Sequence, residues 1–489
     1  MSVSFASKRF VAQLARQQGR AVRVSARRHA SSATASNLSE QRKSDISREA
    51  SLPNPDPSED SQSVAFLKAR APSMVPTYVR PPPVMVKGEG CYIWDMENHR
   101  YLDFTAGIAV NALGHCDEGM VNWMAQQSET LIHCSNLYHN AWTPELSKLL
   151  INETKKADPN SNLSQVFICN SGSEANEAAL KFARKVSYSK DPNSGKTDIV
   201  SFHNSFHGRT FGSLSATPNK KYQAPFGPMV PGFRYGTYND ISAIADLITD
   251  KTCGVIIEPI QGEGGINIAT TEFLQALRKR CDEVDAILIF DEIQCGLSRT
   301  GSFWGYIPSG VQPDIITTAK ALGNGFPIGA TLVSESAVTQ HIKTGDHGTT
   351  FGGNPLACRL AHYIVSRLAS PDLQLGVQSK LTPFKSAFDS WTRKYPGVFS
   401  EFRGRGLIIG FQFAEKYHDK AAELVTAARE RGLLVITAGT GCLRIVPPLT
   451  ITEEEIGEGL EILEEAMDAV FKKADNIGAT RGQQEIAGR

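Results

Sequence analysis

Residues 314–327 read DIITTAKALGNGFP, and this stretch carries the strongest signal for the fold. Its first half is a short run rich in β-branched residues, which is typical of a buried strand. One lysine, Lys320, follows the run, and a Gly-Asn-Gly turn comes soon after it. A lone lysine is usually a solvated surface residue. A lysine at the end of a buried strand can also be a Schiff-base residue and a proton carrier.

Strand and helix signals alternate through the sequence that precedes this stretch. Apolar runs predict strands, and apolar residues at helical spacing predict helices. The strands are expected at 166–169, 199–202, 253–257, 286–290 and 314–318, and helices at 175–186 and 273–284. Strands that are apolar throughout are buried on both faces, as in a parallel sheet covered by helices. The predicted fold class is α/β, with a large domain on a mostly parallel sheet and a small α+β domain.

Charged side chains fall at the ends of three predicted strands. Glu258, Asp291 and Lys320 each lie at or just beyond such an end. Ligands of open α/β sheets bind at the carboxyl ends of the strands, and a carboxylate there must be paired or face a site. Asp291 is suited to keep a pyridine nitrogen of pyridoxal phosphate protonated. Gln294, three residues further on, can reach the hydroxyl group of the same ring.

The segment 170–174 (NSGSE) lies between a predicted strand and a predicted helix. Ser171 and Glu174 match the capping-box pattern, and taken alone they predict only a helix cap. The free N–H groups and the positive dipole end of a helix start also suit a phosphate group. Gly172 would let the backbone approach such a group closely.

Length and composition exclude several classes of protein. A chain of 489 residues is too long for one ordinary core and predicts two domains. No apolar run approaches the roughly 20 residues that cross a bilayer. The nine cysteines include no C-x-x-C pair and no Cys/His cluster at metal-ligand spacing, so no metal site is predicted. The net charge of zero gives no electrostatic reason to expect nucleic-acid binding.

The N-terminal segment differs in composition from the rest of the chain. Residues 1–39 contain seven Lys or Arg and no Asp or Glu, and they are rich in Ser and Ala. This composition predicts a mitochondrial transit peptide over 1–30; the alternative is a disordered basic tail. The other predicted segments are a flexible lead-in (31–70), the N-terminal part of the small domain (71–115), the large cofactor-binding domain (116–370), the C-terminal part of the small domain (371–475) and a polar tail (476–489).

Six short motifs occur in one order along the chain. They are NSGSEANE (170–177), SFHGRT (205–210), EPIQGEGG (258–265), FDEIQ (290–294), TTAKALGNGFP (317–327) and HGTTFGGNP (347–355). Each is weakly specific alone, but together, over roughly 71–470, they resemble the class III aminotransferases. Among these, the chain most resembles acetylornithine aminotransferases of the mitochondrial, fungal type. The resemblance implies fold type I with a small domain from both chain ends, pyridoxal 5'-phosphate as cofactor, a homodimer with a shared active site, and a place in the mitochondrial matrix.

The resemblance also implies roles for individual residues at the cofactor. It implies that Lys320 forms the Schiff base and that Asp291 pairs with the ring nitrogen, as the two catalytic residues. The other implied cofactor contacts are Gly172 and Ser173 at the phosphate, Phe206 stacked on the ring, Gln294 at the ring hydroxyl, and Thr350 reaching the phosphate from the partner subunit. His207, next to Phe206, receives no role.

For the substrates, the resemblance implies transfer of the δ-amino group of N2-acetyl-L-ornithine to 2-oxoglutarate. The products are N-acetylglutamate 5-semialdehyde and L-glutamate, in arginine biosynthesis. Arg209 matches the residue that binds the distant α-carboxylate, and Thr349 and Tyr78 match further substrate contacts. In relatives a Glu masks an Arg when the second carboxylate is absent. Glu263 and Arg403 match these two positions, and Arg405 is an alternative for the Arg.

Other functions remain open at this point. The nearest is ornithine δ-aminotransferase, whose family carries an aromatic residue in the stretch that matches 105–110 and usually Ser before the phosphate Thr. Ile108, expected to line an apolar wall of the substrate site, and Thr349 favour acetylornithine instead. A 4-aminobutyrate aminotransferase would have no α-carboxylate for Arg209. From other classes, the alternatives are an aminomutase, which 2-oxoglutarate would not stimulate, and a catalytically dead paralogue. Lys320 and Asp291 argue against the dead paralogue.

Overall fold

The large sheet has seven strands in the order β4-β12-β11-β10-β7-β5-β6. The structure is a computed structural model that describes residues 52–486, with side chains as far as Phe471. The strands of this sheet are β4 (Leu163–Cys169), β5 (Asp198–Phe202), β6 (Phe233–Gly236), β7 (Thr252–Ile257), β10 (Ile287–Asp291), β11 (Ile315–Thr318) and β12 (Gly329–Ser334). Only β12 runs antiparallel to its neighbours, β11 and β4. The predicted mostly parallel sheet is therefore confirmed.

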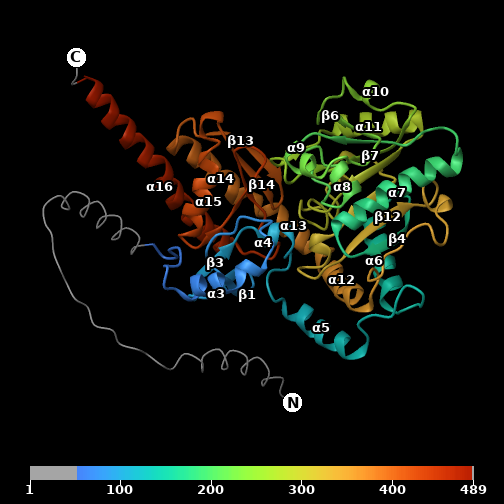
Figure 1. Ribbon diagram of the computed structural model, residues 1–489, viewed down its shortest axis with the longest axis horizontal. Helices are drawn as coiled ribbons and strands as arrows, with labels where there is room; N and C mark the ends of the chain where they lie inside the picture. Colours follow the sequence, from blue (N-terminus) through green and yellow to red (C-terminus); the bar gives the residue numbers. More distant parts are fainter. Residues whose placement is uncertain (1–51, 487–489) are drawn as a thin grey trace. The chain divides into compact units, whose positions relative to one another are not determined.

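Both faces of the large sheet are covered. In β10, Ile287 and Ile289 belong to one buried core and Leu288 and Phe290 to another, because successive side chains of a strand point to opposite faces. Figure 1 shows α7 lying over the sheet. The helices of this part of the chain are α5 (Glu118–Thr130), α6 (Trp142–Ala157), α7 (Gly172–Lys190), α8 (Phe211–Ser215), α9 (Lys220–Gln223), α10 (Ile244–Leu247), α11 (Thr271–Val284) and α12 (Pro355–Leu368).

Both ends of the described chain build the small domain. The strand β15 (Leu433–Leu434) pairs in parallel with β3 (Arg100–Asp103). In the same sheet, β3 pairs antiparallel with β2 (Tyr92–Asp95), and β2 pairs antiparallel with β1 (Met85–Glu89). In Figure 1 the blue β1 and β3 lie beside the orange and red C-terminal elements. This arrangement confirms the small α+β domain predicted from both chain ends.

A second four-stranded sheet of the small domain has the order β13-β14-β17-β16. Its strands are β13 (Phe399–Arg405), β14 (Ile408–Phe413), β16 (Ile436–Ala438) and β17 (Cys442–Ile445), and a short pair is formed by β8 (Ile260–Gln261) and β9 (Asn267–Ile268). The remaining helices are α3 (Gln62–Arg70), α4 (Ala106–Ala109), α13 (Pro371–Ser379), α14 (Leu381–Lys394), α15 (Lys420–Arg429) and α16 (Glu453–Ile486).

The structure departs from the flexible lead-in predicted for 31–70, as far as it describes that segment. The helix α3 begins at a capped position, where Ser61 Oγ accepts a hydrogen bond from Val64 N. Ser63 is fully buried, and its hydroxyl donates to Glu97 at 2.6 Å. Asn54 is also buried and donates to the carbonyl of Arg100. Ser63 and Asn54 thus form hydrogen bonds with the N-terminal part of the small domain, a role that a polar composition alone does not predict.

Two further predicted segments lie at the ends of the chain. The predicted transit peptide (1–30) lies outside the described residues. The helix α16 continues to Ile486, through most of the predicted tail (476–489), and no proline interrupts it there. Among the described residues, no helix is long and apolar enough to cross a membrane.

Candidate active site

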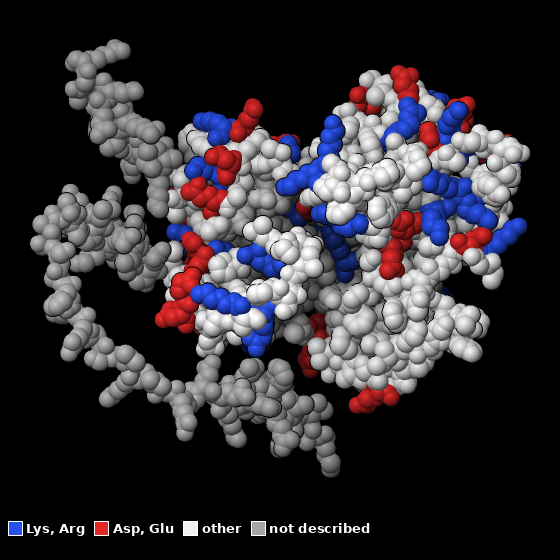
Figure 2. Space-filling model, in the orientation of Figure 1, with Lys and Arg blue, Asp and Glu red and all other residues white. Residues whose placement is uncertain are grey.

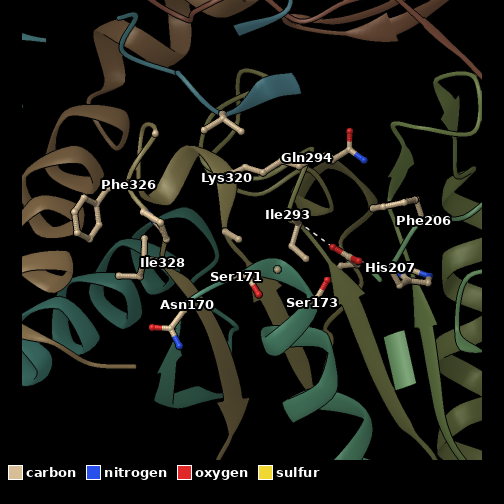
Figure 3. A pocket seen from close by; sticks show the side chains of 17 residues that line it. Asn170, Ser171, Ser173, Phe206, His207, Ile293, Gln294, Lys320, Phe326 and Ile328 are labelled. Atoms are coloured by element: carbon tan, nitrogen blue, oxygen red, sulfur yellow. Dashed lines mark hydrogen bonds and ion pairs between the residues drawn. The ribbon is translucent and has the colours of Figure 1, made fainter. Parts of the chain in front are cut away.

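Three neighbouring strands bring their carboxyl ends to one cavity. The strands β7, β10 and β11 lie side by side and run parallel, so Glu258, Asp291 and Lys320 meet at the same edge. The cavity has a volume of about 310 Å³. Figure 3 shows it between the start of α7 and the ends of these strands. Its lining includes Asn170, Ser171, Gly172, Ser173, Phe206, His207, Gly208, Asp291, Gln294 and Lys320.

Asp291 is the most firmly held charged group of this cavity. It is only 2% exposed. Its Oδ2 accepts hydrogen bonds from His207 Nδ1 at 2.7 Å and from Asn176 Nδ2 at 2.8 Å, and its Oδ1 accepts from the backbone N–H of Ile293. Three donors, two of them from distant parts of the sequence, thus fix the orientation of one carboxylate, as a catalytic charge requires.

His207 and Asn176 are residues that the sequence did not single out. The ring of His207 is buried and its Nε2 has no hydrogen-bond partner among the described residues, so the contact of Nδ1 with Asp291 is the one hydrogen bond of the ring there. Asn176 also donates to the carbonyl of His207 and accepts from Thr317 Oγ1. His207 stands 84 positions before Asp291, and only the folded sheet brings the two together.

Glu258 lies beside Asp291, in surroundings that disfavour its charged form. Burial, and then the neighbouring carboxylate of Asp291, raise the pKa of Glu258 well above its ordinary value. Its carboxyl oxygens accept from the backbone N–H groups of Phe206, at 3.0 Å, and Gly262. Glu258 therefore holds the loop that carries Phe206 at the cavity wall.

Lys320 sits in a strained backbone conformation just after β11. Its φ of 41° lies in the left-handed region, which is unusual for a residue with a side chain and is often found at functional sites. Burial, and then the charge of Arg444, lower the pKa of Lys320 to about 8. A much larger fraction of this amine is therefore neutral near pH 7.5 than for an ordinary lysine, and a neutral amine is the nucleophilic form.

The start of α7 forms the floor of the cavity. Ser171 caps the helix by accepting from Glu174 N at 3.2 Å, so the predicted cap is present. Ser173 Oγ accepts from the backbone N–H of Arg209 and thereby ties the 206–209 loop to the helix. A Cβ at Gly208 would lie 2.3 Å from Ser173 Oγ, so only glycine allows this close approach.

A second cavity, of about 470 Å³, contains two of the predicted substrate residues. Tyr78 and Arg209 line it together with Thr77, Phe211, Leu214 and Phe226. The guanidinium carbon of Arg209 lies 3.8 Å from the ring centre of Tyr222 and 5.5 Å from that of Phe206. Since Phe206 also lines the first cavity, Arg209 stands at the boundary of the two. Ile108, expected near the substrate, is 45% exposed and is not among the residues that line either cavity.

Glu263 forms its ion pair with Arg444, and this corrects the predicted partner Arg403. Glu263 Oε2 lies 2.9 Å from Arg444 Nη2. Arg444 also donates to Gln294 Oε1, at 3.2 Å, in the wall of the first cavity. Arg403 instead pairs with Glu401 and donates to Asn267.

Register explains why the sequence pointed to the wrong arginine. Arg403 on β13 and Arg444 on β17 both lie opposite Gly410 of the strand between them, so they occupy one row of the same sheet. The alternative, Arg405, donates to the carbonyl of Gly305. Of these three arginines, Arg444 is the one whose charge, after burial, lowers the pKa of Lys320, which places that charge near the amine.

Thr349 and Thr350 lie on a loop that leaves the rim of the first cavity. Thr349 Oγ1 accepts from Asn170 Nδ2 at 3.0 Å, and Asn170 lines the cavity. Thr350 is exposed and is not among the residues lining the cavity of its own chain.

Comparisons with known proteins agree with this geometry. Residues 74–467 match the aminotransferase class-III family. The acetylornithine aminotransferase, mitochondrial, of Neurospora crassa is 61% identical over 425 residues, which cover 86% of this chain and 91% of that protein. The acetylornithine aminotransferase of Caldanaerobacter subterraneus is 46% identical, over 81% of this chain and 98% of that protein.

Solved structures include two similar proteins. The N-acetylornithine aminotransferase from Stenotrophomonas maltophilia is 36% identical, with a TM-score of 0.70 over 81% of this chain and 98% of that chain. The ornithine aminotransferase from Toxoplasma gondii is 28% identical, with a TM-score of 0.79 over 91% of this chain and all of that chain. With the cavity, its lysine and its carboxylate in place, the chain belongs to the class III aminotransferases.

Proposed function

We propose that the chain is a pyridoxal-phosphate-dependent acetylornithine aminotransferase of arginine biosynthesis. It moves the δ-amino group of N2-acetyl-L-ornithine to 2-oxoglutarate and gives N-acetylglutamate 5-semialdehyde and L-glutamate. The observation that carries the proposal is the pair of neighbouring cavities, with Lys320 and Asp291 in one and Arg209 in the other. The names of the similar proteins support the same substrate.

The residues of the first cavity fit pyridoxal 5'-phosphate. The amine of Lys320, the fixed carboxylate of Asp291 and the amide of Gln294 suit the aldehyde, the ring nitrogen and the ring hydroxyl. The backbone N–H groups of Gly172 and Ser173 at the start of α7 suit the phosphate. Phe206 provides a flat apolar face for the ring. When bound, the cofactor supplies an electron sink for the bond-breaking step at the substrate carbon.

The protein residues would divide the remaining work. Lys320 would transfer the proton, because its lowered pKa lies near the working pH. Asp291 would hold positive charge on the neighbouring ring nitrogen, with His207 and Asn176 fixing its orientation. Arg209 would bind the α-carboxylate of the amino donor in a bidentate pair. Tyr78, in the same cavity, and Thr349 at the rim would contact the substrate beside it.

The Glu263–Arg444 pair addresses the need to accept two kinds of substrate. Glutamate and 2-oxoglutarate would bring a carboxylate close to Lys320, whereas the ω-amine of acetylornithine would not. Arg444 would bind that carboxylate when present, and Glu263, which is far more exposed than Arg444, would take its place otherwise. A buried arginine needs a partner in both states, because an unpaired buried charge is costly.

Replacing Arg444 by methionine is expected to raise the KM for 2-oxoglutarate on the order of 10²-fold, the scale of losing one partner of a buried charge pair. Half-reactions measured separately should show a much smaller effect with N-acetylornithine. Arg403→Met is the matched control, since Arg403 occupies the same row of the sheet but contacts Glu401. A larger effect from Arg403→Met than from Arg444→Met would contradict the assignment.

Substrate selectivity gives a direct test of the proposed function. None of the residues that line the second cavity is acidic, so the α-ammonium group of ornithine would be left there without a partner. The uncharged acetamide avoids this cost. In a panel of amine donors at fixed 2-oxoglutarate, kcat/KM is expected to be roughly tenfold or more higher for N-acetylornithine than for ornithine. Arg209→Ala should raise the KM for N-acetylornithine strongly and the KM for glutamate less. Equal or better use of ornithine would refute the acetylornithine assignment.

A homodimer with a shared active site is part of the proposal. Figure 2 shows a face around α5 that is nearly free of charged side chains. Exposed apolar residues gather in α5 and in the loop after it, and they are Val121, Leu131, Ile132, Leu137 and Tyr138. Phe351, 62% exposed, adjoins this loop at His133. Such a patch marks an interaction surface, and exposed Thr350 beside it would reach the phosphate of the partner subunit.

The proposed location is the mitochondrial matrix. Four similar fungal proteins are named mitochondrial, which supports a mitochondrial location. Deleting residues 2–28 is expected to leave the activity intact and to redirect the protein to the cytosol, because this segment is basic and free of acidic residues. Cell fractionation would test this, and a truncated protein that still enters mitochondria would show that the signal lies elsewhere.

A further inference from the structure

The loop from Asp346 to Gly353 is fixed at both of its ends. At the C-terminal end, Asn136 Nδ2 donates to the carbonyls of Thr349 and Gly352, both at 2.9 Å. Thr143 Oγ1 and Asn140 Nδ2 both donate to the carbonyl of Gly353. Backbone carbonyls held in this way leave the end of the loop little freedom.

His347 fixes the other end. Its ring centre lies 4.8 Å from that of Phe167 on β4 and 5.7 Å from that of Phe182 on α7. Its Nδ1 lies 2.8 Å from Lys181 Nζ. A lysine ammonium can only donate, so His347 Nδ1 is the acceptor and the ring is neutral. Burial, and then the charge of Lys181, lower the pKa of His347, which favours this neutral form of the ring.

The side chains between these two ends of the loop differ in their surroundings. Thr349 Oγ1 accepts from Asn170 at the rim of the cavity of its own chain. Thr350 and Phe351 are exposed. Only two residues separate His347 from Thr350, so the direction of Thr350 depends on where His347 is held.

We propose that His347 is a positioning residue that aims Thr350 at the phosphate group in the partner subunit. The proposal rests on the homodimer and shared site of the proposed function. The Lys181 hydrogen bond sets the direction of the loop, and the ring of His347 packs beside it against Phe167 and Phe182. The same loop contacts Asn170, so each loop links the phosphate site of one chain to that of its partner.

The test measures how fast the holoenzyme dimer loses pyridoxal phosphate, by absorbance in the presence of a trap, together with sedimentation to verify the dimer. His347→Phe keeps the ring but loses the acceptor, and His347→Asn keeps an acceptor oxygen near the Nδ1 position. We expect His347→Phe to lose the cofactor about tenfold faster, the effect of one charge-assisted hydrogen bond. His347→Asn should restore most of the retention.

Further variants separate the possible outcomes. Lys181→Met should match His347→Phe, and the double variant should be no worse than either alone, because both remove one interaction. Thr350→Val should also lose the cofactor faster. Unchanged retention in Thr350→Val would overturn the shared site and with it the role of His347. Unchanged retention in His347→Phe beside faster loss in Thr350→Val, or equal loss from His347→Asn and His347→Phe, would overturn the role of His347 alone.

Discussion

Replacing Lys320 by alanine is expected to abolish turnover while the protein still folds. The change removes both the amine that would bind the cofactor covalently and the group that would carry the proton. General acid–base catalysis alone is worth about 10²–10⁴-fold, so the total loss should be on the order of 10⁴-fold or more. The variant should be no less stable, since the wild-type amine is held away from water with a pKa of about 8, below its ordinary value.

The assignment of Lys320 can be checked without measuring activity. Borohydride reduction of the wild-type protein with bound cofactor, followed by peptide mapping, should place the label on Lys320. Lys279→Ala on the exposed side of α11 is a suitable control and should keep both label and turnover. Label on any other lysine would remove Lys320 from its proposed role.

The proposed catalytic pair, Asp291 and Lys320, was predicted from the ends of strands, which depend on local sequence alone. Asp291 and Lys320 each follow a short apolar run, and a parallel sheet forces the ends of such runs to one edge. In the structure, β10 and β11 are neighbours, and Asp291 lies opposite Thr317. The meeting of these two residues at one edge of the sheet therefore follows from the parallel strands alone and does not depend on how the loops pack.

The second carboxylate site could not be predicted in the same way. Arg403 and Arg444 both belong to antiparallel strands of the small domain, where the sequence gives no strand order. The two residues share one row, and only the side-chain contacts separate them: Glu401 takes Arg403, and Glu263 takes Arg444. Which of the two arginines faces the cavity therefore depends on where the folded chain places acidic partners, one of which, Glu263, is 181 residues from Arg444 in the sequence.

Backbone strain is a further property that the sequence hides. Ala106, Ile108 and Ala109 all have positive φ, between 45° and 67°, although none is glycine. Residues with side chains adopt this region at a cost of about 1–3 kcal/mol each and only where the surroundings enforce it. The strain turns Ile108 outward and leaves Val110 at the first cavity. A helical or apolar pattern cannot predict this turn. Ile108 was expected beside the substrate only from its place in the stretch 105–110, where the ornithine family carries an aromatic residue.

Replacing Asp291 by asparagine is expected to lower the rate of a single half-reaction by about 10²–10³-fold or more, the scale of losing a preorganised charge in a buried site. A neutral amide cannot keep the ring nitrogen of the cofactor protonated. The hydrogen bonds change as well. His207, Asn176 and Ile293 all donate to the present carboxylate, and asparagine offers only one acceptor oxygen to the three. The variant should therefore also lose about 1–3 kcal/mol of stability.

Loss of stability and loss of chemistry can be separated with a second, half-buried aspartate, Asp314. Asp314 lies at the opposite, amino end of β11, where it accepts from Leu288 N and Arg278 at 2.8 Å each. Asp314→Asn should lower the melting temperature much as Asp291→Asn does, because it too leaves donors without an acceptor. It should keep the single-turnover rate of the folded enzyme, since Asp314 is remote from the cavity end of the strands. If Asp291→Asn retained a near-normal rate, or if Asp314→Asn lost the rate equally, the carboxylate at the end of β10 would not be the group that holds the charge of the ring.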